Sequence, residues 1–229
     1  MNVDDVDDDV IPTPTRELDR LDLIYDRQAE LALKYHDIEA KNDLLQFATM
    51  PIDIHDRFGQ ARLKDFAWRI TEELAEATQA LKDHEHIRTH FLEELSDAYH
   101  FLIELNLLSS LAPEAIYSYL TAEHKYYSDK HCKLEILFDL VFINQGIYSL
   151  SESAYNVIQG LGNAMNCLKN KPWKTTHILT DEGEYRRNLI RANEAFIALA
   201  IASGLDADGL FKIYFKKSEV NKFRQRSNY

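Results

Sequence analysis

Apolar residues recur at the three- and four-residue spacing of amphipathic helices along most of the 229-residue chain. The chain contains only 7 Gly and 5 Pro, so few positions interrupt this pattern. Pattern and composition together predict an all-α protein. The predicted helices span about 13–41, 61–83, 88–109, 113–129, 134–148, 152–170, 184–203 and 206–219. Thr13 with Pro14 indicates the first helix start, and Gly204 the stop between the last two helices.

The N-terminus departs from the helical pattern. Residues 1–12 are acidic and poor in large apolar side chains, which predicts a disordered tail. Residues 13–229 then form a single all-α domain, long enough to bury a substantial core.

The second half of the chain repeats the first at low similarity. Three segments align in the same order, namely 67–83 with 154–170, 101–107 with 196–202 and 113–120 with 207–214. We therefore predict a helical bundle built from two degenerate helical repeats, with halves at about 61–129 and 148–223. The alternative is the chance likeness of any two amphipathic helices. The apolar skeleton recurs but the acids do not, because Glu73 aligns with Gly160 and Asp97 with Ala192.

Charge and cysteine content limit the class of protein. The net charge of −12 makes a nucleic-acid polymer an improbable partner. Two cysteines do not make a disulfide framework, which favours a reducing, cytoplasmic setting. No apolar run approaches the roughly 18 residues that a membrane span needs, and the acidic N-terminus is unlike a signal peptide.

Two acidic clusters lie on the predicted helices 61–83 and 88–109. The first comprises Glu72, Glu73 and Glu76, and the second Glu93, Glu94 and Asp97. Spacings of three and four residues place the carboxylates of each cluster on one helix face. A helix hairpin would bring the clusters together, and a hard divalent cation would offset their repulsion. For either cluster alone, a solvated surface is the alternative reading, but both are embedded in apolar residues.

These motifs resemble a known superfamily. Glu72-Glu73-x-x-Glu76 followed by Glu94-x-x-Asp97 is similar to the acidic motif of the all-α NTP pyrophosphatases, which include dimeric dUTPases, phage dCTP pyrophosphatases and MazG proteins. Asp97 to Phe101 is similar to the family's D-x-x-H-F. The C-terminal stretch resembles its K-N-x-x-N-x-x-R-Q-x-x-G-Y tail, with matches at Lys217, Asn221, Arg224, Gln225 and Tyr229 and departures at Ser218 and Asn228. The resemblance covers about residues 15–229 and is strongest at the motifs.

The resemblance implies a reaction and a set of ligands. It implies hydrolysis of a deoxynucleoside triphosphate to the monophosphate and pyrophosphate, with dUTP ahead of dCTP, by a homodimer. Mg²⁺, or alternatively Mn²⁺, would be bound by Glu73, Glu76, Glu94 and Asp97, with Glu73 as the general base. The substrate phosphates would be bound by Lys217, Asn221, Arg224 and Tyr229. Glu72, Glu93 and His100 are expected to support the metal ligands.

The base pocket is expected to involve the first helix. Gln28 fits the glutamine by which dimeric dUTPases contact uracil, but the residues after it look more like the first helix of phage dCTP pyrophosphatases. Trp68 precedes the first acidic cluster, where several relatives have a tryptophan, and an aromatic ring there could stack on a base. Core packing is the alternative role for Trp68, and a structural role is the alternative for His100.

Three other functions fit parts of the pattern. One is a MazG-like enzyme of broad or purine preference. Another is a carboxylate-bridged di-iron bundle, which is disfavoured because Asp97-x-x-His100 is its one near match and the second half lacks the acids. The last is a non-catalytic helical interaction protein with surface acids.

Overall fold

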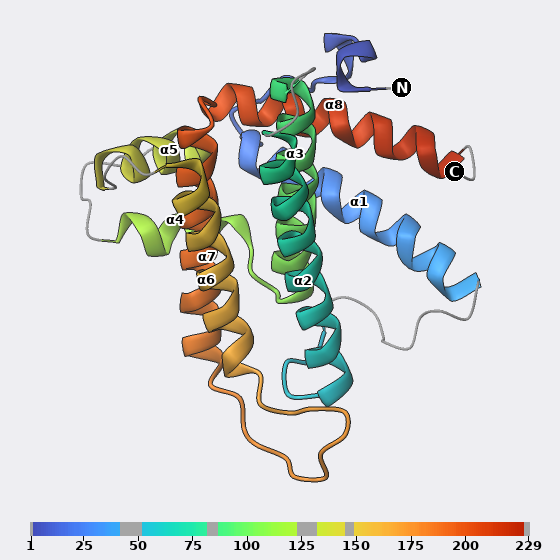
Figure 1. Ribbon diagram of the computed structural model, residues 1–229, viewed down its shortest axis with the longest axis vertical. Helices are drawn as coiled ribbons and strands as arrows, with labels where there is room; N and C mark the ends of the chain where they lie inside the picture. The colour runs from blue at the N-terminus through green and yellow to red at the C-terminus, as the bar shows by residue number, and fades with distance from the viewer. Residues whose placement is uncertain (1, 42–51, 82–86, 123–131, 145–148, 227–229) are drawn as a thin grey trace.

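A computed structural model describes residues 2–41, 52–81, 87–122, 132–144 and 149–226, and these residues contain helices and loops without a strand. The α-helices are α1 (Arg20–Lys41), α2 (Arg57–Ala80), α3 (Ile87–Leu108), α4 (Pro113–Thr121), α5 (Lys133–Asn144), α6 (Leu150–Cys167), α7 (Glu182–Ala202) and α8 (Ala207–Arg226). The all-α prediction is confirmed (Figure 1). Parts of the predicted loop 42–59 and of the predicted helix ends near 82–83, 123–129 and 145–148 lie outside the described residues.

The first helix begins later than the sequence predicts. Thr13 and Pro14 are not helical, and α1 begins at Arg20. The reason is a stronger cap, because Asp19 Oδ1 accepts hydrogen bonds from the backbone N–H groups of Leu21 (2.7 Å) and Asp22 (3.0 Å). At the other end of the chain, α8 continues to Arg226 rather than stopping near residue 219.

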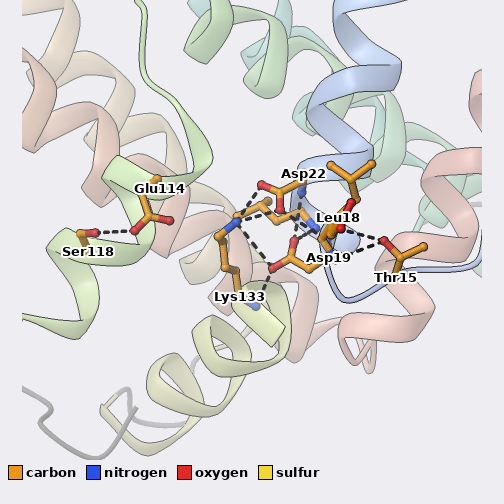
Figure 2. A network of polar contacts seen from close by, with 9 residues as sticks. Thr15, Leu18, Asp19, Asp22, Glu114, Ser118 and Lys133 are labelled. Atoms are coloured by element: carbon orange, nitrogen blue, oxygen red, sulfur yellow. Dashed lines mark hydrogen bonds and ion pairs between the residues drawn. The ribbon is translucent and has the colours of Figure 1, made fainter. Parts of the chain in front are cut away.

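A polar network fixes the start of α1 to α5 (Figure 2). The backbone N–H of Lys133 donates to Asp19 Oδ2 at 2.8 Å, and the Lys133 ammonium contacts both carboxylate oxygens of Asp22 at 2.8 Å. Asp19 is only 2% exposed, so these hydrogen bonds replace the water that it has lost. The network therefore holds the N-terminal end of the helix that carries Gln28.

Two helix hairpins form the centre of the molecule. Figure 1 shows α2 beside α3 and α6 beside α7. Helices α1 and α8 both pack against α3 and extend to one side of it. Tyr99 of α3 stacks on Phe196 of α7, with ring centroids 4.8 Å apart, and both rings are buried. Gly204, with φ of +78°, follows the end of α7 as predicted.

The α6–α7 hairpin is packed tightly at the positions that align with the acids of the α2–α3 hairpin. A Cβ atom on Gly160 would lie 2.9 Å from Ala192 Cα, so α6 and α7 approach too closely there for any side chain. By the sequence alignment these two positions correspond to Glu73 and Asp97. The contact accords with the predicted repeat, which stays a prediction.

The N-terminal tail differs from the expected disorder. Val3–Asp5 and Asp8–Val10 form short 3-10 helices that lie on α8. Val3 and Val6 are buried against Val220. Asp8 contacts Lys216 at 2.7 Å, so the tail's acids face a basic helix that composition alone does not reveal.

Candidate active site

Three of the four predicted metal ligands come together between α2 and α3. One carboxylate oxygen from each of Glu73, Glu76 and Glu94 lies within 4.8 Å of the other two. The arrangement follows from helix periodicity, because the neighbouring Leu74 and Leu95 are buried in the hairpin contact. The carboxylates consequently gather along one edge of that contact.

The carboxylates of this cluster repel one another when they are ionised, which favours a bound cation. Burial, the charge of Asp97 and a hydrogen bond with Glu94 together raise the pKa of Glu73 to about 8. Burial also raises the pKa of Glu94, against the opposing charge of Lys217. Oxygen ligands at this separation fit a hard divalent cation, which would replace the shared proton as the counter-charge.

Asp97 has a different environment from the other three acids. Its Oδ2 lies 2.8 Å from Lys217 Nζ, and its Oδ1 accepts a hydrogen bond from the Asn221 amide at 3.3 Å. Lys217 is only 2% exposed, and its Nζ is also 3.7 Å from Glu93 Oε2. The lysine expected to bind phosphate is thus a buried counter-ion between the acids of α3 and the last helix.

The remaining predicted residues are more dispersed. Glu93 Oε1 accepts a hydrogen bond from the Val3 backbone N–H at 3.1 Å. Arg224 is exposed in the last turn of α8, and Tyr229 lies outside the described residues. Trp68 is 62% exposed, and its indole N–H donates to Glu72 at 2.8 Å. The structure therefore places Trp68 on the outer face of α2.

A cavity of about 170 Å³ adjoins the acidic cluster at Asp97. Residues of α1, α2, α3 and α8 line it, namely Gln28, Leu31, Tyr35, Glu39, Arg62, Phe66, Arg69, Asp97, His100, Phe101, Glu104 and Asn221. Gln28, the residue expected to contact the base, therefore lines the same cavity as Asp97. Arg62 and Arg69 each lie 5.0 Å from the Phe66 ring and add positive charge to the wall.

The polar side chains of this cavity are held in place. The Gln28 amide nitrogen donates to Glu104 Oε2 at 2.9 Å, while its oxygen accepts from the Tyr214 hydroxyl at 2.8 Å. Burial raises the pKa of Glu104 to about 7. His100 stacks on Tyr214 with centroids 4.0 Å apart.

Sequence reasoning missed Glu104 and the two arginines. A signal for Glu104 was present, because it follows Asp97 by seven residues and His100 by four, and so continues their helix face by one turn. Arg62 and Arg69 are likewise seven residues apart, one on each side of Phe66.

Comparison with protein families shows which family the chain belongs to. A family model described as dUTPase matches residues 71–229, more than half of the chain. The chain belongs to the dUTPase family. This dUTPase-family protein is therefore a nucleoside triphosphate pyrophosphatase, a hydrolase with a deoxynucleoside triphosphate as substrate. The match includes Glu73 and Asp97 and leaves out Gln28, so the first helix has no part in it.

Two further comparisons gave no match. Neither a curated protein nor a solved structure matched this dUTPase-family chain. Among the described residues, no helix is both long and apolar enough to cross a membrane.

Proposed function

We propose that this enzyme hydrolyses a pyrimidine deoxynucleoside triphosphate, dUTP or dCTP, to the monophosphate and pyrophosphate. The observation that carries the proposal is the small cavity directly beside the carboxylate cluster. A cavity of about 150 Å³ holds a benzene ring, so one of about 170 Å³ suits a single six-membered ring. A purine needs more room, which disfavours the MazG-like alternative with purine preference.

Mg²⁺ is the proposed metal, with Glu73, Glu76 and Glu94 as its ligands. When bound, the ion supplies positive charge opposite the triphosphate and polarises a phosphoryl oxygen. Asp97 lies at the border of this set, and its pairing with Lys217 and Asn221 connects the metal ligands to α8.

Glu73 is the proposed general base. A carboxylate takes up a proton efficiently when its pKa lies near the working pH. Without a bound metal, burial and the neighbouring acids raise the pKa of Glu73 to about 8, and a divalent cation beside it would lower this pKa toward the working pH. Its role is to accept a proton from the attacking water.

The phosphates are proposed to lie along α8. Asn221 is on the cavity wall, and Arg224 follows it by one turn with its side chain exposed. An exposed guanidinium can bind a phosphate through two hydrogen bonds. The tail motif therefore supplies the neutral and cationic donors, while Lys217 orders the acids behind them.

A homodimer is proposed from the resemblance to dimeric dUTPases. Trp68 on α2 and Tyr155 on α6 are each 62% exposed. Exposed aromatic side chains of this size are enriched where proteins contact one another. A second copy packed on α2 or α6 would cover one of these side chains.

The test is a panel of common NTPs and dNTPs, including dUTP, with Mg²⁺. Chromatography must separate monophosphate plus pyrophosphate from diphosphate plus phosphate. We expect dUTP or dCTP to give monophosphate and pyrophosphate. Faster cleavage of a purine triphosphate would overturn the pyrimidine assignment, and no cleavage of any triphosphate would overturn the proposal.

A further inference from the structure

Two buried side chains, His100 and Glu104, lie one helical turn apart on the α3 face that lines the cavity. The enzyme family alone does not explain why a base-sized cavity should have a carboxyl group in its wall. The hydrogen bonds around these two residues determine what they can offer to a ligand.

His100 offers an acceptor. Its Nδ1 lies 2.8 Å from the Ser96 carbonyl oxygen, which can only accept, so Nδ1 carries the proton. Burial lowers the pKa of His100 to about 4, so the ring is neutral and its Nε2 is unprotonated. Within the described part of the chain, this buried Nε2 meets no hydrogen-bond donor.

Glu104 offers a second acceptor. The Gln28 amide occupies Oε2, and no donor from the described residues reaches Oε1. The shorter contact of the Tyr214 hydroxyl is with the Gln28 oxygen, at 2.8 Å against 3.2 Å to the Ile24 carbonyl oxygen, which favours the orientation in which the Gln28 amide nitrogen faces Glu104. Glu104 as a whole residue is 4% exposed and its helix packs in the core, so its position is fixed.

We propose that Glu104, with His100 beside it, selects a base that carries an amino group at its 4-position, so that dCTP is preferred to dUTP. The proposal rests on the function proposed above and specifies its substrate. The two N–H groups of the cytosine amino substituent match two acceptors, and acceptance from this group is a common role of glutamate. Uracil presents a carbonyl oxygen at the same position, which would leave the buried His100 Nε2 unpaired and would be repelled by the Glu104 carboxylate. The order implied by sequence resemblance, dUTP first, is thereby reversed.

The experiment compares dCTP, dUTP and the triphosphate of the deoxynucleoside whose 2-pyrimidinone base lacks the 4-amino group. It is done at pH 8, where Glu104 is mostly ionised and cannot donate to the uracil carbonyl. We expect kcat/KM of the wild-type enzyme for dCTP to exceed that for both other substrates by about tenfold or more. In Glu104→Gln an amide replaces the carboxylate and can donate to uracil. The dCTP to dUTP ratio should fall by about tenfold, mainly through KM.

Glu39→Gln is the matched control. Glu39 lines the same cavity, but both its oxygens accept hydrogen bonds from Arg62, at 2.9 and 2.7 Å. Its substitution removes the same charge and should leave the dCTP to dUTP ratio unchanged. An equal shift of that ratio in Glu39→Gln would overturn the role of Glu104.

The wild-type comparison decides the proposal even if a variant does not fold. Equal rates for dCTP and the 2-pyrimidinone substrate, or a preference for dUTP, would overturn the selection of an amino group while leaving the pyrophosphatase function intact. If no triphosphate is hydrolysed, the proposed function fails and this inference fails with it.

Discussion

Lys217 Nζ lies 2.8 Å from Asp97 Oδ2, so a buried ion pair joins the last helix to the acid-bearing helix α3. Replacing Lys217 with Met should leave Asp97 and Glu93 without their counter-ion. A broken buried pair costs about 3 kcal/mol or more, so the free energy of unfolding should fall by that order in urea denaturation.

A surface ion pair on the same helix provides the comparison for Lys217. Lys212 lies 2.6 Å from Asp208, and its side chain is 51% exposed. Lys212→Met should leave the unfolding curve almost unchanged, because exposed pairs contribute little. If Lys217→Met were equally stable but had a much higher KM for triphosphate, Lys217 would be a phosphate ligand, as the tail motif alone implies.

Glu73→Gln should reduce kcat by about 10²–10⁴-fold, the usual contribution of a general base, and by more if the metal is lost as well. Monophosphate release measures the effect. Glu72→Gln is the control. Glu72 is next to Glu73 in the sequence, but it is exposed and its carboxylate accepts a hydrogen bond from Trp68. We expect that variant to keep its kcat within a few-fold. Near-native turnover by Glu73→Gln would contradict the assignment of the base.

Mg²⁺ should stabilise the fold. A ligand at 100 times its Kd adds about 2.7 kcal/mol to the free energy of unfolding. Thermal denaturation with and without Mg²⁺ measures the gain, with NaCl at equal ionic strength as the control. The gain should disappear in Glu94→Gln, and an equal gain in that variant would place the cation elsewhere.

The raised pKa of Glu104 predicts that the free energy of unfolding depends on pH. Its pKa is raised from 4.5 to about 7 by burial, so between these values the folded chain holds a proton that the unfolded chain has released. Stability should therefore fall as pH rises through this window, by about 3 kcal/mol in total. Glu73, whose pKa is also raised, adds to the loss in both proteins, so urea denaturation at pH 5 and pH 8 should show a loss that is about 3 kcal/mol smaller in Glu104→Gln than in the wild type. Equal losses would mean that Glu104 is already ionised in the folded protein.

The sequence predicted the parts of the site that follow from helix periodicity. Spacings of three and four residues placed Glu73, Glu76 and Glu94 on facing helix edges, and the structure brings them together. The burial of Lys217 was not predictable, because its pairing with Asp97 depends on how α8 crosses α3. The contact of the N-terminal tail with α8 was not predictable for a related reason, since Asp8 pairs with Lys216, a residue more than 200 positions away.

The contact between Gly160 and Ala192 leaves no room for an acidic side chain at this point of the α6–α7 hairpin. A glutamate at position 160 would have its Cβ within 2.9 Å of Ala192 Cα, so the two helices would have to separate before its carboxylate could bind anything. That separation would open the core between α6 and α7. The tight contact therefore makes this hairpin a rigid support, whereas the α2–α3 hairpin leaves room for carboxylates at its edge.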